Sequence, residues 1–195
     1  PFGRQKLSAL LAASIEEDLR ALKNMTIERK GQFKRDELLP RYREQVKRLL
    51  DAGHPDPAVG RYLVWCFDAG QVEEGLELAK WCLEHGQGLP DGFSSTLHFF
   101  VASQVLAWAE AQQKAAHSCE PYLGDTLEAM ERDNWDVPDK IKAGFHKLKA
   151  QAAESGGELA EAVTAYEKAF ALGAKVETKL NAARKKLEKA TEPGQ

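Results

Sequence analysis

The chain has 195 residues, of which 43% are hydrophobic and 29% charged, and its formal net charge is −3. These values are ordinary for a soluble globular protein and allow one medium-sized domain or two small ones. No apolar run approaches the ~18 residues that a membrane span requires, so no membrane partner is expected. Because the chain begins with Pro1 rather than Met, we expect it to be a trimmed piece of a longer protein.

Charge is distributed unevenly along the sequence. Residues 1–50 contain 12 Lys and Arg against 7 Asp and Glu, residues 51–138 contain 4 against 15, and residues 139–195 contain 11 against 8. A basic front followed by an acidic middle predicts a negatively charged partner near the front. It also allows head-to-tail association between copies of the chain.

Residues 6–34 have the periodicity of a long amphipathic helix. Their apolar positions recur every three or four residues, and four of them are our candidates for an oligomerisation seam: Leu11, Ile15, Leu19 and Leu22. A single apolar stripe needs a partner surface, either in the rest of the chain or in another copy. We favour another copy, because the segments that follow can close a small core without this helix.

The remaining sequence is predicted to be helical throughout, which makes the fold class all-α with about eight or nine helices. Periodicity, glycines and prolines place helices at residues 36–50, 57–68, 73–84, 96–117, 138–153 and 176–190, with two more beginning near residue 121 and after residue 157. Asp36 is expected to cap the first of these, with Pro40 tolerated in its first turn. The expected domains are residues 1–35 for oligomerisation, DNA binding or both, residues 36–190 as a helical core, and residues 191–195 as a frayed tail.

Two helical hairpins share one spacing pattern. Gly70, Val72, Gly75, Ala79 and Cys82 are followed, 87 residues later, by Gly157, Leu159, Ala162, Tyr166 and Ala169. Small residues at such positions resemble those of the tetratricopeptide repeat, where they allow paired helices to pack closely. Two units do not make a solenoid, so we predict hairpins of similar packing rather than a repeat array.

Patterns for catalysis and for cofactor binding are absent from the sequence. There is no nucleotide-binding loop, no paired histidine motif and no nucleophile signature. Asp133, Asp136 and Asp139 are the best candidates for carboxylates that hold Mg²⁺, but capping of the next helix by Asp136 is the simpler interpretation. The three cysteines, Cys66, Cys82 and Cys119, have no metal spacing and favour a reducing compartment. We therefore assign no catalytic residue, no metal and no cofactor.

Basic residues are concentrated between residues 29 and 48. Six of them are our candidates for DNA contact: Arg29, Lys30, Lys34, Arg35, Arg41 and Arg43. Such a density suits contacts with backbone phosphates, which drive non-specific and salt-dependent DNA affinity. Acidic residues are interspersed among them, so a solvated helix face of alternating charge is the alternative. The charges alone do not decide between the two.

One block of the sequence carries a family pattern. It consists of the run RDELLP at residues 35–40, a tryptophan-bearing helix and the segment DAGQVEEGLELAKWCLEHGQGLP. The positions that fit are Trp65, Asp68, Gly70, Gly75, Leu76, Glu77, Ala79, Leu83, Gly86 and Pro90. The block resembles the core of the small terminase subunit of Peduovirus-type, temperate tailed bacteriophages. Later positions, such as Val137-Pro138-Asp139 and Gly156-Gly157, fit the same family more loosely.

This resemblance implies a role in packaging viral DNA in the host cytoplasm. Small terminase subunits recognise the packaging, or cohesive-end, site on double-stranded phage DNA, assemble into homo-oligomeric rings and regulate the large terminase subunit. The family is sometimes described as the endonuclease subunit that makes cohesive ends. Two alternatives stay open: a helical-repeat adaptor that binds protein through its hairpin grooves, and a Mg²⁺-dependent nuclease.

Overall fold

The computed structural model describes residues 2–191, with side chains from residue 5 onward. Every regular element in this range is a helix, which confirms the predicted all-α class. No helix in the same range is long and apolar enough to cross a bilayer. The chain divides into two compact units, Pro1–Leu97 and His98–Gln195.

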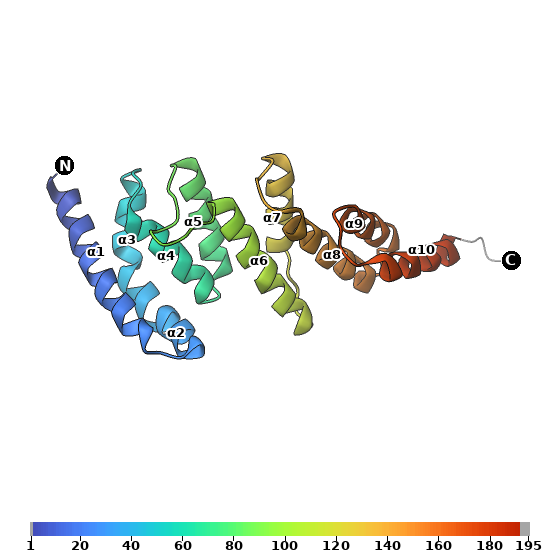
Figure 1. The fold of residues 1–195 in the computed structure, drawn as a ribbon, viewed down its shortest axis with the longest axis horizontal. Helices are drawn as coiled ribbons and strands as arrows, with labels where there is room; N and C mark the ends of the chain where they lie inside the picture. The colour runs from blue at the N-terminus through green and yellow to red at the C-terminus, as the bar shows by residue number, and fades with distance from the viewer. Residues whose placement is uncertain (1, 192–195) are drawn as a thin grey trace. The chain divides into compact units, whose positions relative to one another are not determined.

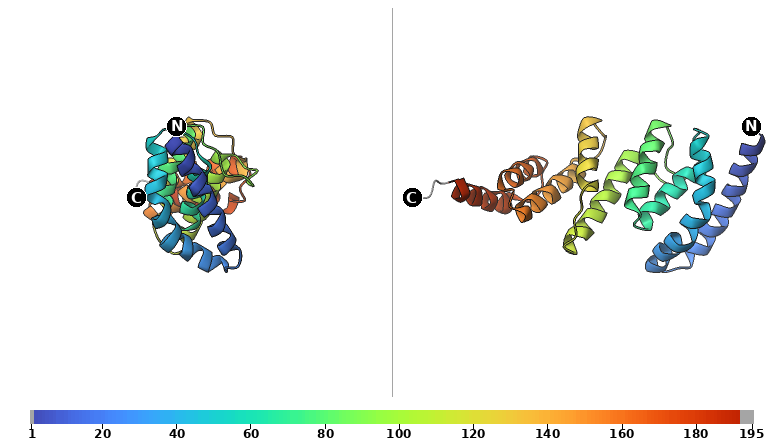
Figure 2. Two further views of the ribbon diagram at one scale, coloured as in Figure 1. Left: turned by 90° about the vertical axis from the view of Figure 1, so that its left-hand side faces the viewer. Right: turned by 180° about the vertical axis from the view of Figure 1, so that it is seen from behind.

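The first unit begins with a helical hairpin (Figures 1 and 2). Its elements, in order, are α1 (Phe2–Lys23), α2 (Ile27–Phe33), the π-helix η1 (Lys34–Leu38), α3 (Leu39–Asp51), α4 (Pro57–Asp68) and α5 (Val72–Glu84). The expected long helix is interrupted at residues 24–26, where Thr26 accepts a hydrogen bond from the Arg29 N–H and caps α2. From there α2, η1 and α3 follow one another without a break, and we call residues 27–51 the basic rod.

The π-helical turn explains why Asp36 does not cap a helix as expected. Asp36 lies inside η1, where the Leu39 N–H bonds to the Lys34 carbonyl five residues earlier. Pro40 follows and has no N–H to donate, and its ring would crowd the carbonyl four residues before it in a regular α-helix. The wider turn absorbs the proline, so the rod continues where the sequence suggested a helix start.

Close backbone approaches hold the hairpin of α4 and α5 together. A Cβ atom at Gly60 would lie 2.7 Å from the Gly88 carbonyl oxygen, and one at Gly75 would lie 3.1 Å from the Phe67 ring. The Gln87 side chain accepts a hydrogen bond of 2.6 Å from the Asp56 N–H at the start of α4. Close packing therefore explains the glycines of the family block at Gly60 and Gly75.

The second unit contains α6 (Leu97–Lys114), α7 (Tyr122–Arg132), α8 (Asp139–Gly156), α9 (Leu159–Ala171) and α10 (Glu177–Thr191). Its C-terminal core is closed by α8, α9 and α10 around small and aromatic side chains: Ala150, Ala165, Tyr166, Ala169, Val176, Leu180 and Ala183. Because four of these seven are alanines, the three helices approach one another closely.

The two predicted hairpins of similar packing have the same backbone. Gly70 and Gly157 both end a helix in the left-handed region, at φ of 75° and 82°. In both places the following N–H bonds back to the residue five positions earlier, at 2.8 Å from Gln71 to Cys66 and 2.9 Å from Glu158 to Ala153. The partner helices, α5 and α9, then have 13 residues each. Each unit thus contains one copy of the same hairpin.

Candidate nucleic-acid interface

The basic rod lies beside α1 and holds all six predicted DNA-contact residues. Among the described residues, four of the six form side-chain hydrogen bonds or ion pairs with other parts of the first unit, and two form none. Adjacent residues of a helix point in different directions, so these four side chains reach different neighbours: α1, the end of α4, and α5.

Arg41 connects the rod to α1. Its Nη1 atom donates to both carboxylate oxygens of Asp18, at 2.8 and 3.0 Å. Tyr42 OH donates to Asp18 Oδ2 at 2.6 Å and lies 2.6 Å from Ser14 Oγ. Asp18 is only 8% exposed, so its charge is compensated inside the unit by a paired arginine and a phenol.

Arg43 connects the rod to α5. It forms two hydrogen bonds to the Glu74 carboxylate, of 3.3 and 2.9 Å, and the same carboxylate accepts a 2.7 Å bond from Tyr62 OH. The Glu74 hydrogen bond raises the pKa of Arg43, and burial raises the pKa of Tyr62, so neither group titrates near neutral pH. Glu74 thus joins α5 to α3 through Arg43 and to α4 through Tyr62.

Lys34 and Arg35 connect the rod to the end of α4. Lys34 Nζ lies 2.6 Å from Asp68 Oδ2, and the Arg35 guanidinium donates twice to the Ala69 carbonyl at 3.1 Å. The last carbonyls of a helix carry a partial negative charge, so cations at this position stabilise the helix end. No local sequence pattern could indicate these partners, because they lie 34 residues away.

Arg29 and Lys30 are the two predicted contacts whose charges stay unpaired. Neither side chain forms an ion pair within the described part of the chain, and the same holds for Lys47 and Arg48 further along the rod. Arg29 lies beside a shallow hollow lined in part by Glu28, Asp36 and Glu37. The cationic surface that can reach a phosphate is therefore smaller than the sequence suggests.

The predicted oligomerisation stripe packs within the first unit. Leu11, Ile15 and Leu22 are 5%, 8% and 5% exposed, and Leu19 is partly buried. The partner surface that the stripe requires is thus supplied by the chain itself. It comes chiefly from α4, and Arg41 and Tyr42 of the rod bond to Asp18 on the same helix, α1. A contribution of these residues to an interface between copies stays a prediction.

The aspartates considered for Mg²⁺ do not gather. Asp133 forms a bidentate pair with Arg132, which lowers its pKa, and Asp139 begins α8. Asp136 does not cap that helix, since the cap position is Pro138 and no side chain bonds there. Between residues 2 and 191 no three His, Cys, Asp or Glu side chains are placed to hold a metal ion.

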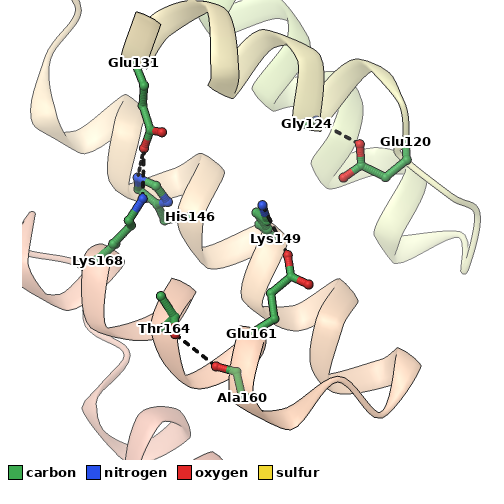
Figure 3. A network of polar contacts seen from close by, with 9 residues as sticks. All are labelled: Glu120, Gly124, Glu131, His146, Lys149, Ala160, Glu161, Thr164 and Lys168. Atoms are coloured by element: carbon green, nitrogen blue, oxygen red, sulfur yellow. Dashed lines mark hydrogen bonds and ion pairs between the residues drawn. The ribbon is translucent and has the colours of Figure 1, made fainter.

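Charged residues also line a groove of about 530 Å³ between α7, α8 and α9 of the second unit (Figure 3). Lys168 and Glu131 form an ion pair of 3.2 Å, as do Lys149 and Glu161. His146 is 5% exposed, with Nε2 3.4 Å from Glu131 Oε1, and burial together with Lys168 lowers its pKa. Both lysines of this groove are already paired with glutamates, so the groove is lined by paired charges and has no vacant anion site among the described residues.

Comparisons with known proteins match a part of the chain that includes the family block identified in the sequence. Residues 12–140 match the family model described as phage small terminase subunit. The chain is 32% identical over 149 residues to the "Probable terminase, endonuclease subunit" of Haemophilus phage HP1 (strain HP1c1), which covers 73% of this chain and 51% of that protein. It is 27% identical over 158 residues to the "Terminase, endonuclease subunit" of Escherichia phage P2, covering 80% and 63% respectively. The chain thus spans between half and two thirds of these relatives' length, and no solved structure matches it.

Proposed function

The chain belongs to the phage small terminase subunit family, and on this premise we propose that it recognises viral double-stranded DNA at the packaging site, assembles into a homo-oligomeric ring and regulates the large terminase subunit. The observation that supports the proposal most strongly is the family match across residues 12–140. That range includes the whole basic rod. The work would take place in the host cytoplasm.

In this proposal the rod has two kinds of cation. Arg29 and Lys30 are free to neutralise phosphates, whereas Arg35, Arg41 and their neighbours hold the rod against α1 and α4. Arg41 and Arg43 keep 46% and 55% of their side chains exposed, so they can add to the field around the DNA while they remain paired. The acidic face of α5, with Glu73 and Glu77, is the proposed surface for the large subunit.

A nuclease role is the second candidate, because both relatives are named as endonuclease subunits. It would require Mg²⁺ and carboxylates such as Asp136, which lie apart in the described residues. A protein-binding adaptor is a third possibility, which would use the groove of the second unit.

One experiment separates the three candidates. The full chain is mixed with a labelled duplex at two salt concentrations, with and without Mg²⁺, and both binding and cleavage are measured. DNA packaging predicts binding that weakens as salt rises, since released counterions drive it. The adaptor predicts no such binding, and the nuclease predicts Mg²⁺-dependent cutting that Asp136→Ala abolishes. Mass measurement in solution tests assembly, and a monomer at micromolar concentration would contradict the ring.

A further inference from the structure

The end of the helical hairpin formed by α1 and the basic rod exposes an unusual side chain. We call residues 23–30 the hairpin tip, and Figure 1 shows it at the lower end of α1. Ile27, the first residue of α2, is 89% exposed, the highest value among the exposed large hydrophobics of the described residues. Met25, two residues earlier, is only partly buried. Covering so exposed an apolar side chain with a partner surface would gain free energy, because it removes apolar area from water.

Cations surround this apolar point. Lys23, Arg29 and Lys30 lie within four residues of Ile27, and none of the three has an ion-pair partner in the described part of the chain. Lys30 follows Ile27 by one helical turn, which places both on the same side of α2. Glu28 is the one carboxylate of the tip, and it lines the acidic hollow with Asp36 and Glu37. Arg29 lines the same hollow, so Lys23 and Lys30 are the cations of the tip that lie outside it.

The partner must therefore be anionic at its edge and apolar between its charges. A DNA groove has this chemistry, since phosphates border it and sugars and stacked base edges lie between them. Isoleucine is one of the side chains that can wedge against a base step while lysines contact the flanking phosphates. We propose that the hairpin tip is the part of the chain that enters a DNA groove, with Ile27 against the base or sugar edges and Lys23 and Lys30 on the phosphates. The proposal rests on the proposed function and specifies its contact.

The test uses the full chain and a 2-aminopurine-labelled duplex. Ile27→Ser removes the apolar contact and should weaken binding about tenfold, because burying one such side chain is worth at least one decade in affinity. It should leave the slope of log K against log salt unchanged. Lys23→Gln and Lys30→Gln should each reduce that slope by roughly 0.9, the value for one phosphate contact. The parent should raise 2-aminopurine fluorescence, and Ile27→Ser should not.

Matched controls come from the same unit. Leu10→Ser changes another exposed hydrophobic residue, 61% exposed on α1, and Arg48→Gln changes another unpaired cation. The first should alter DNA affinity by less than about twofold, as surface changes away from a contact do. The second should leave the 2-aminopurine signal unchanged.

The outcomes distinguish this inference from the function on which it rests. If the parent binds DNA and Ile27→Ser binds equally well, the tip is not the contact, although the packaging role stands. If the parent shows no salt-dependent DNA binding, both fail. If Ile27→Ser instead loses binding to vesicles of phosphatidylglycerol while DNA binding is unchanged, the tip is a lipid contact and the proposal is overturned.

Discussion

The Asp18 network predicts a measurable loss of stability when its carboxylate is removed. Asp18 is 8% exposed and accepts one hydrogen bond from Tyr42 and two from Arg41. Asp18→Ala removes all three but strands no buried group, because Tyr42 OH keeps its contact with Ser14 and Arg41 can reach water.

The size of this loss of stability depends on how exposed Tyr42 and Arg41, the two partners of Asp18, are to solvent. The buried Tyr42 bond to a charged group is worth about 1.5–3 kcal/mol. The Arg41 pair is worth only about 0.5 kcal/mol, because 46% of the arginine side chain is exposed and solvent screens it. Asp18→Ala should therefore cost about 2–3 kcal/mol. Arg41→Ala should cost about 1–2 kcal/mol, because it leaves the buried carboxylate with one partner.

Urea unfolding followed by tryptophan fluorescence measures this loss. The Trp65 ring centroid lies 5.5 Å from that of Tyr42, so its emission reports on the first unit. Arg48→Ala is the matched control, since this exposed arginine has no ion pair in the described residues and should change stability by less than about 0.5 kcal/mol. If Asp18→Ala costs no more than Arg48→Ala, the network does not hold α1 to the rod and the reasoning is refuted.

Three further predictions concern packing, protons and thiols. Gly60→Ala places a Cβ 2.7 Å from the Gly88 carbonyl oxygen and should lower the free energy of unfolding in urea by about 1–3 kcal/mol. Gly156→Ala is the control, because a Cβ there has no atom within 4 Å and should not destabilise the chain. Equal effects of the two variants would contradict the close approach at Gly60. Burial lowers the pKa of His146 in the folded state, so the stability it contributes is present above its unfolded pKa of about 6.5 and is lost as pH falls below that value. The melting temperature should fall as the pH drops below about 6.5, and His146→Gln should flatten the decline. Cys66 and Cys82 are buried, and burial raises the pKa of both thiols, that of Cys82 to about 12. Iodoacetamide should therefore label them only after unfolding, which mass spectrometry can measure. Labelling of these two cysteines in the native chain would argue against their burial.

Much of the fold could be predicted because it depends on local signals. Glycines, prolines and a period of 3.6 residues mark the helix ends, and the 87-residue offset correctly indicated two similar hairpins. The break at residues 24–26 and the π-turn before Pro40 were not predicted. Apolar periodicity continues through both, and only the hydrogen-bond geometry distinguishes them.

The candidate site was harder to predict, because charge counts carry no information about partners. The sequence placed six basic residues together but could not show that Asp18, Asp68 and Glu74 lie against three of them, and the Ala69 carbonyl against a fourth. These contacts join residues 23 to 34 positions apart, beyond the reach of any local pattern. Ile27 was overlooked because its exposure depends on where α2 begins.

The π-helical turn at η1 also sets a phase between the two ends of the rod. Its hydrogen bonds span five residues instead of four, so the turn accommodates one extra residue and everything before it is rotated by about 100° relative to what a continuous α-helix would give. The contacts of Arg41 and Arg43 fix the later part, and the turn then decides the direction in which Ile27 and Lys30 project. Deleting one residue from η1 would keep the rod helical and its composition almost unchanged, yet would point the tip elsewhere.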